Sequence, residues 1–344
     1  MSLGPTDRAV EPRAGRRWRW LTLAAGIALV LVAALAWIQG PWARRGFVEF
    51  KMLSPTDIPV GIAAAPDGTV WFTIEFSDAI GRVRGGVVEK LRKGSENMEP
   101  LGLAIDGEGH AWYTDAPLRA ISRVSPDGSV TSFGLSTPVT RLGRLASAPG
   151  GGVWFAEPST VSVTHLRDGR FTRYPVGPFT PVGAQNAGPF GVAVAGDGAV
   201  WATLQNANKL VRILPGGEMT EIEVPTRRSG LGDIAIDPGG AVWFLETSAN
   251  KIGRYAGGRF EEFPVPTPSA GLTALAIAPD GAAWFTELRA HKLGRVRDGV
   301  VTEFPLPRPD ARPIGVAVDL ENNVWYTDLG GWVGRLAADR ARSR

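Results

Sequence analysis

Seven tryptophans recur along this chain at nearly constant intervals, and this period constrains the fold more than any other feature. The intervals are 41, 42, 47, 42, 41 and 41 residues. Each tryptophan follows a short turn sequence and opens an apolar segment, as in PDGTVWFT and PDGAAWFT, and a second segment of the type IGRV comes after it. The seven are Trp71, Trp112, Trp154, Trp201, Trp243, Trp284 and Trp325.

A period near 40 residues made of short strands and turns is typical of β-propeller blades. The 44 glycines and 27 prolines interrupt each unit too often for a repeat of paired helices. In the sixth repeat we expect strands at 272–278, 282–287, 292–297 and 300–305, because tight-turn residues separate these segments. The chain is therefore predicted to be all-β, with one seven-bladed propeller over residues 46–337.

The two ends of the repeat array complement each other. The last repeat has three expected strands, at 314–318, 323–327 and 333–336, and then stops. Residues 46–52 contain the alternating segment Phe47-Val48-Glu49-Phe50, which resembles the missing outer strand. We therefore expect this segment to complete the seventh blade and close the ring, leaving no unpaired blade edge. The charged tail, residues 338–344, is expected to be disordered.

The N-terminal segment predicts export. Residues 21–38 form an 18-residue run without a charge, just long enough to cross a bilayer. Arginines precede this run and tryptophans flank it, as expected for a membrane anchor. We therefore expect a cytoplasmic segment at 1–20, an anchor at 21–38 and a linker at 39–45. The propeller would then lie on the periplasmic or extracellular side of a bacterial-type cytoplasmic membrane. The alternative is a signal peptide cleaved near Ala34-Leu35-Ala36, which would release the propeller.

Composition excludes several classes of function. The chain has no cysteine, so disulfides and thiol chemistry are absent. Residues 1–45 hold seven arginines against two acidic residues, and the rest of the chain has a net charge of about −2. This balance gives no electrostatic surface for nucleic acid, and we expect a monomer that binds a small or peptide-like molecule.

The repeat unit resembles that of the streptogramin B lyases, a family of seven-bladed propellers. The unit runs from an inner strand through G-x-[VA]-W-[FY]-T-[ED] to N-K-[IL]-G-R and then to an outer strand that ends E-F-P-[VL]-P. The best matches are GGAVWFLETSANKIGRY (239–255), GAAWFTELRAHKLGRV (281–296) and EFPVPTPSAGLTALAIAPDG (262–281). The resemblance extends over residues 46–337 and implies the fold more specifically than the activity.

The resemblance implies an elimination that opens an ester ring, with a catalytic histidine and a magnesium ion held by glutamates near the central opening. It places the histidines after a proline at the start of an inner strand. Glu75 and Glu99 match positions of the family's metal-binding glutamates. None of the positions that match the histidines is histidine in this chain: they are Val60, Leu101, Gly143, Phe190, Gly232, Thr273 and Ile314.

Acidic residues stand three positions after most of the repeat tryptophans. Because equivalent positions come around one ring in a propeller, such acids suit Mg²⁺ or Ca²⁺, which prefer several oxygen ligands. The alternative is that each acid pairs with a lysine or arginine of its own or a neighbouring blade. The acids are Asp115, Glu157, Glu246, Glu287 and Asp328, of which Glu246 and Glu287 are metal candidates.

Charged residues replace small ones at two inner-strand positions. Most blades have Gly or Ala after the position that matches the family's histidines, whereas two have Arg144 and Asp233. A charge at a crowded inner strand needs a partner or a ligand, so both are candidates for ligand binding and catalysis, the alternative being a mutual salt bridge. Phe190 and Gln185 are further ligand-binding candidates at the same rim.

Three histidines are present, and one is a catalytic candidate. His291 takes the asparagine place of the N-K-I-G-R motif, in a loop expected at the face where the inner strands begin. His110 and His165 are expected in surface loops. Together these features predict a streptogramin-lyase-like propeller that binds a small or cyclic ligand at its central funnel, without the family's histidines. The alternative is a non-catalytic, membrane-tethered binding or scaffold module.

Overall fold

The computed structural model describes residues 46–93, 101–136, 141–177 and 188–342. The predicted membrane segment 21–38, Glu99 and Gln185 lie outside these residues. Within the described ranges, no helix has the length and apolar character to cross a membrane.

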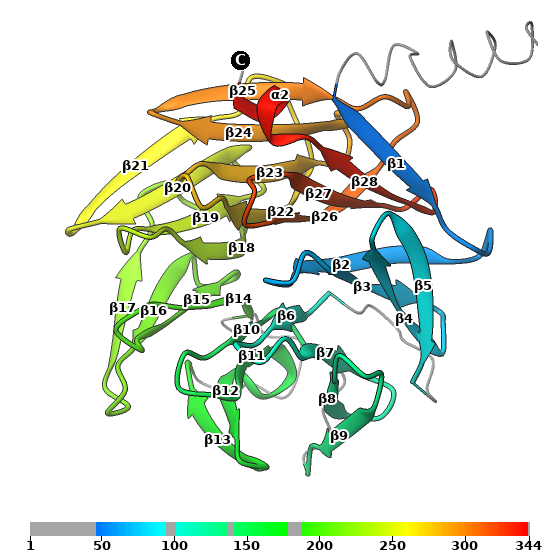
Figure 1. Ribbon diagram of the computed structural model, residues 1–344. Coiled ribbons are helices and arrows are strands. Elements are labelled where there is room, and N and C mark those ends of the chain that lie inside the picture. The colour runs from blue at the N-terminus through cyan, green and yellow to red at the C-terminus, as the bar shows by residue number, and fades with distance from the viewer. Residues whose placement is uncertain (1–45, 94–100, 137–140, 178–187, 343–344) are drawn as a thin grey trace, which may run out of the picture. The chain divides into compact units, whose positions relative to one another are not determined.

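The described residues form seven four-stranded antiparallel sheets, one for each tryptophan, which confirms the seven-bladed propeller (Figure 1). Blades are numbered from the one that contains Trp71. The first blade is β2 (Ile58–Ala64), β3 (Val70–Glu75), β4 (Ala79–Arg84) and β5 (Val87–Arg92). The second is β6 (Leu103–Ile105), β7 (Ala111–Asp115), β8 (Ala120–Val124) and β9 (Val130–Gly134). The third is β10 (Leu145–Ser147), β11 (Val153–Glu157), β12 (Ser162–Arg167) and β13 (Arg170–Pro175), with a 3₁₀ turn at Pro158–Thr160.

The fourth blade is β14 (Pro189–Val194), β15 (Val200–Leu204), β16 (Lys209–Ile213) and β17 (Met219–Glu223). The fifth is β18 (Leu231–Ile236), β19 (Val242–Glu246), β20 (Lys251–Ala256) and β21 (Arg259–Pro264). The sixth is β22 (Leu272–Ile277), β23 (Ala283–Glu287), β24 (Lys292–Arg297) and β25 (Val300–Pro305). The strands expected in the sixth repeat agree with these bounds to within one residue.

The seventh blade joins the two ends of the repeat array. It contains β26 (Pro313–Val318), β27 (Val324–Asp328), β28 (Trp332–Leu336) and, at its outer edge, β1 (Phe47–Lys51). β1 pairs with β28 from Phe47 opposite Leu336 to Lys51 opposite Trp332. The prediction that residues 46–52 supply the missing strand is confirmed.

The inner strands contact one another in cyclic order around the ring, from β2 through β26 and back to β2. The threonine two residues after the repeat tryptophan links some of them across blades. Thr203 donates a hydrogen bond to Gly232 O (2.7 Å) and accepts one from Gly191 N (2.9 Å). Thr327 makes the same contacts from the seventh blade to Val60 O of the first. These buried bonds explain why the repeat carries W-x-T.

The repeat tryptophans fill the spaces between blades. Trp201, for example, packs with Val242 and Phe244 of the next blade. In six blades an arginine on the third strand stacks on the tryptophan at 5.3–5.7 Å, and in the third blade His165 takes that place, with ring centroids 4.3 Å apart. Each arginine thus covers an aromatic ring, and Arg295 is itself buried there.

The tail differs from expectation. Residues Ala338–Arg342 form the short helix α2, and Ala341 is buried in the core cluster that contains Phe47 and Leu336. The expected disorder of the tail is therefore wrong for these residues, because the small alanines between the charges pack against the closing strand pair.

We predict that the ring depends on the buried side of β1. Phe47 is 4% exposed and lies edge-on to Tyr326, whereas the neighbouring Val48 is 42% exposed. Phe47→Ala should lower the free energy of unfolding by about 3 kcal/mol, because it leaves a cavity at the closure. Val48→Ala is the matched control and should change it by less than about 0.5 kcal/mol. Chemical denaturation of both variants measures this, and equal losses would contradict the role assigned to the closing strand.

Candidate functional site

Two faces of the ring are distinguished by the direction of the inner strands. We call the face at which the inner strands begin the strand-start face, and the face at which they end, with the tight turns to the second strands, the turn face. The positions that match the family's histidines all lie at or just before the start of an inner strand. The predicted funnel is therefore at the strand-start face.

The structure brings Arg144 and Asp233 together at this funnel. Arg144 Nη2 lies 3.5 Å from Asp233 Oδ2, and both side chains are largely buried. Arg144 Nη1 donates to Leu101 O (3.3 Å), and Nη2 donates to Thr273 O (2.9 Å). These partners belong to the second, fifth and sixth blades, so the third-blade guanidinium reaches across the axis of the ring.

The carboxylate of Asp233 is held by main-chain N–H groups of the fifth and sixth blades. Its Oδ1 accepts a hydrogen bond from Ile234 N and its Oδ2 one from Leu275 N, both at 3.0 Å. Among the described residues, the enclosed Nε of Arg144 has no hydrogen-bond partner. The expected alternative of a mutual salt bridge is thus present, and among the described residues it leaves Nε of the guanidinium without an acceptor.

The remaining ligand-binding candidates are only partly described. Phe190 lies on the inner strand β14, and its carbonyl accepts a hydrogen bond from Arg144 N (3.0 Å). Its backbone therefore helps to hold Arg144 in place. Gln185 lies outside the described residues, so its part in the funnel stays a prediction.

Three of the acids that follow the repeat tryptophans are fully buried and have a cationic partner. Glu157 Oε2 lies 2.9 Å from Arg173 Nε on the outer strand of its own blade. Asp328 Oδ2 lies 2.8 Å from Arg308 Nη2, which comes from the loop after the sixth blade. Asp115 lies 3.6 Å from Lys93 Nζ. For these three acids the alternative of pairing with a cation is the one observed.

Glu246 and Glu287 differ from Glu157 because a glutamate stands at the position of the outer-strand arginine. Glu262 lies at the register position of Arg173, and its carboxylate binds Lys251 Nζ at 2.6 Å and Thr226 Oγ1 at 2.8 Å. Glu303 binds Lys292 Nζ and Thr267 Oγ1 in the same way. Glu246 and Glu287 are fully buried, and their carboxyl oxygens have no hydrogen-bond partner among the described residues.

The charge state of these two acids follows from that environment. Burial, together with repulsion from Glu262, raises the pKa of Glu246 to about 7, although Lys251 opposes the shift. Burial and Glu303 raise the pKa of Glu287 to about 8. Glu262 is also penalised by burial, but its hydrogen bonds from Lys251 and Thr226 hold its pKa below the usual value. In each blade the inner acid therefore tends to hold a proton while the outer acid is ionised.

The described residues contain no cluster of candidate metal ligands. No three His, Asp or Glu side chains come together as metal ligands would in the described part of the chain. Glu246 and Glu287 do not fit a hard cation, because each faces a lysine-bound glutamate and tends to hold a proton. Glu75 ends β3, and within the described ranges it makes no side-chain hydrogen bond or ion pair. Glu99 lies outside them, so the pair implied by the resemblance stays a prediction.

The histidines lie away from Arg144 and Asp233. His291 has a φ of 58°, the left-handed conformation also adopted by Asn208 and Asn250 at equivalent places. Its Nδ1 lies 2.5 Å from Ala311 O and therefore acts as the donor in this loop contact. His110 Nδ1 lies 3.0 Å from Asp106 Oδ2 in a turn on the turn face. His165 is in strand β12, so the expectation of a surface loop is wrong for it.

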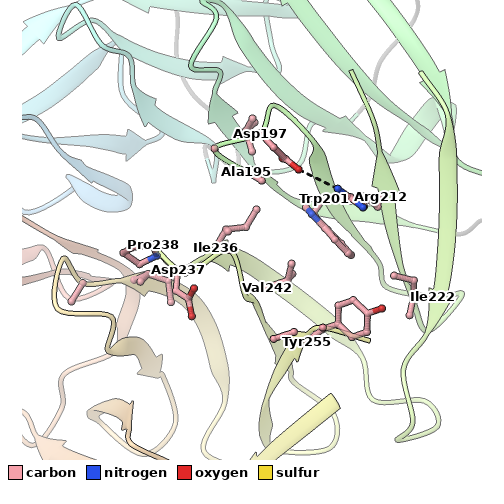
Figure 2. Close-up of a pocket in the computed structure, with 18 of the residues that line it drawn as sticks. Ala195, Asp197, Trp201, Arg212, Ile222, Ile236, Asp237, Pro238, Val242 and Tyr255 are labelled. Atoms are coloured by element: carbon pink, nitrogen blue, oxygen red, sulfur yellow. Dashed lines mark hydrogen bonds and ion pairs between the residues drawn. The ribbon is translucent and has the colours of Figure 1, made fainter. Parts of the chain in front are cut away.

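One feature was not predicted from the sequence. A cavity of about 1120 Å³ opens on the turn face between the fourth and fifth blades (Figure 2). Its walls include Trp201, Arg212 and Ile222 from the fourth blade and Tyr255 from the fifth. The sequence feature that could have indicated this cavity is an aliphatic residue at a position where most blades have an outer-strand aromatic residue. This difference can be recognised only once the strand register is known.

We predict that stability falls with rising pH because of Glu246 and Glu287. Their folded-state pKa values exceed the unfolded value of 4.5. The stability they contribute is therefore present below pH 4.5 and is lost as the pH rises through about 7 to 8, by roughly 3 kcal/mol for Glu246 and roughly 5 kcal/mol for Glu287. The double variant E246Q/E287Q should show a flatter dependence of Tm on pH between 5 and 8.5, because the amide resembles the neutral acid.

E157Q is the control for this prediction. It replaces the carboxylate that faces Arg173 with an uncharged amide, so it should lower Tm throughout that pH range. Differential scanning calorimetry at several pH values measures both effects. A wild-type Tm that does not fall between pH 5 and 8.5, or a slope that persists in E246Q/E287Q, would contradict the assignment.

Comparison with known proteins agrees with the fold and with the repeat. The chain is 34% identical over 196 residues to virginiamycin B lyase from Nocardia farcinica, a match that spans 57% of this chain and 65% of that relative. The chain thus matches less than two thirds of the relative's length.

Solved structures of lyases have the same architecture. A catalytically inactive histidine-to-alanine variant of virginiamycin B lyase from Staphylococcus aureus, solved with quinupristin, superposes with a TM-score of 0.78 at 27% identity, covering 85% of this chain and 98% of that one. A streptogramin B lyase structure superposes with a TM-score of 0.77 at 27% identity, covering 84% and 96%. The model of the virginiamycin B lyase family matches residues 43–180 and 167–343. The chain therefore belongs to the virginiamycin B lyase family.

Proposed function

We propose that this propeller binds a small or cyclic ligand at the funnel of its strand-start face and does not catalyse the family's elimination. The observation that carries the proposal is the guanidinium of Arg144 at the centre of the ring. It is held by Asp233 and by two main-chain carbonyls, and 14% of its side-chain surface stays exposed. A fixed cationic donor of this kind suits a ligand carbonyl or carboxylate.

The absence of catalysis rests on the histidine positions. An elimination needs a base beside the ester carbonyl. The seven positions that match the family's histidines carry none, and His291 is used in a loop contact with Ala311 O. In the Staphylococcus aureus lyase, a histidine-to-alanine variant is catalytically inactive and has been solved with quinupristin. Loss of an imidazole and retention of a ligand are thus compatible in a relative.

A non-catalytic scaffold is the second candidate. It is favoured by the internal pairing of Arg144, because Asp233, Leu101 O and Thr273 O already give each terminal nitrogen of the guanidinium at least one partner. In that case the group would stiffen the ring centre, and a partner would bind elsewhere on the propeller.

The proposal includes a location outside the cytoplasmic membrane. Residues 21–38 would anchor the chain or, if cleaved, direct its secretion. The support is the uncharged run with its flanking arginines and tryptophans. Cell fractionation with alkaline carbonate extraction separates the two: an anchored chain stays in the membrane pellet, and a cleaved one is recovered in soluble form at a lower mass. Recovery of the full-length chain from the cytoplasm would contradict both.

Quinupristin tests the binding proposal. The full chain should bind it in isothermal titration calorimetry, and Arg144→Met should weaken binding about tenfold, because a charge-assisted hydrogen bond contributes about 1.5–3 kcal/mol. Arg123→Met is the matched control, since Arg123 stacks on Trp112 between blades and should not affect affinity. We expect no ring opening by chromatography under conditions in which the Staphylococcus aureus lyase converts the compound. Ring opening would refute the non-catalytic assignment, and equal effects of both substitutions would favour the scaffold.

A further inference from the structure

The cavity between the fourth and fifth blades lies on the face opposite the funnel. It extends from the outer strand of the fourth blade, near Ile222, to Val318 and Leu320 of the seventh blade beside the axis. In Figure 2, Trp201, Ile222 and Tyr255 surround the outer part of this space. The cavity is therefore separate from Arg144 and Asp233 and has no part in the proposed function.

An aromatic ring of the repeat is missing at this cavity. In five blades an outer-strand phenylalanine or tyrosine lies against the tryptophan of the same blade, with ring centroids 5.0–6.0 Å apart. Ile222 occupies the equivalent register position in the fourth blade, opposite Leu210. Trp201 therefore has no aromatic ring of its own blade against it, and it lines the cavity.

Two residues of the fifth blade line the same space. Tyr255 stands opposite Val242, where the other blades have only valine, leucine or isoleucine. Its ring is tilted by 56° to Trp201 with centroids 5.8 Å apart, so two aromatic side chains wall the cavity at an angle. The next residue is Ala256, where the first, third and sixth blades carry Arg84, Arg167 and Arg297. Two departures from the repeat, Ile222 and Tyr255, thus coincide at this groove, next to the small side chain of Ala256.

The charged groups of the cavity are already paired within the protein. Arg212 Nη2 lies 3.1 Å from Asp197 Oδ2. Asp237 accepts hydrogen bonds from Trp243 Nε1 and Ala241 N, both at 2.9 Å. The surface left for a ligand is therefore mostly aromatic and aliphatic, with little free charge, and does not select a charged molecule.

We propose that this cavity binds a small uncharged aromatic molecule, whose ring lies beside Ile222 against the parts of Trp201 and Tyr255 that line the cavity. Tyr255 forms the second wall, and the inner part of the cavity leaves room for substituents towards the axis. Offset or edge-on contacts between rings stabilise such a complex beyond the area they bury. The site takes aromatic rings in preference to aliphatic rings of similar size.

Indole and p-cresol are the probes, and cyclohexanol is the aliphatic control. Saturation-transfer NMR and calorimetry on the full chain should detect binding of both aromatic compounds, with cyclohexanol at least tenfold weaker. Ile222→Phe restores the ring of the repeat, so it should reduce the affinity for indole at least tenfold while Tm stays the same or rises. Leu91→Phe makes a similar change at the equivalent register position of the first blade and should leave binding unaltered.

Tyr255→Val provides a second variant in case Ile222→Phe does not fold. It introduces the residue that other blades use and removes one aromatic wall, so indole should bind several-fold more weakly. Arg144→Met, which alters the funnel, should leave indole binding unchanged and so separates this site from the proposed function. The proposal is overturned by no binding at millimolar indole, by equal affinity for cyclohexanol, or by Leu91→Phe weakening binding as much as Ile222→Phe.

Discussion

Each blade of this propeller buries one sheet face against the next, so the structure depends on the ring being closed. The tryptophan of one blade packs against side chains of its neighbour, and threonines of the second strands bond to inner-strand carbonyls across the blade boundary. An open array would expose these surfaces at both ends. The pairing of β1 with β28 removes those ends by a contact between the beginning and the end of the repeat array, and Phe47 then shares one core cluster with Leu336 and Ala341. Local repeats are thus stabilised by a single long-range pairing.

A constant scaffold allows charge to vary at equivalent positions. Each of the five buried acids stands three residues after its tryptophan, but the residue that it faces differs from blade to blade. An arginine at that place neutralises Glu157 directly, whereas a glutamate bound to lysine leaves Glu287 without a donor and raises its pKa to about 8. In such a site two carboxyl groups lie close together in a buried environment. Protonation of one of them avoids the cost of burying a second negative charge. Repetition of the backbone therefore does not imply repetition of the electrostatics.

The fold was largely predictable because its determinants are local. Turn residues and strand alternation placed the strands of the sixth repeat to within one residue, and the unmatched outer strand of the last repeat indicated the closure. The placement of Arg144 and Asp233 at the opening followed from their common repeat position. Their reach across the axis to Leu101 O and Thr273 O did not, because it depends on side-chain length and on the diameter of the ring. The acids after the tryptophans were placed on the correct strands, but the period alone does not say whether such a side chain faces the opening or the space between blades.

The departures from the repeat now fall into two groups that lie on opposite faces. Arg144 and Asp233 add charge at the strand-start face. The guanidinium of Arg144 is itself the cation there, and Asp233 holds it in place. Ile222 and Tyr255 remove or redirect side-chain volume at the turn face and open an aromatic-walled cavity. Adjacent blades contact mainly through the packed faces of their sheets. A substitution at the turn face of the ring therefore need not disturb the strand-start face. A propeller can therefore lose the residues of one chemistry at the funnel while retaining its fold, and it can acquire a binding surface elsewhere through a few substitutions between two blades.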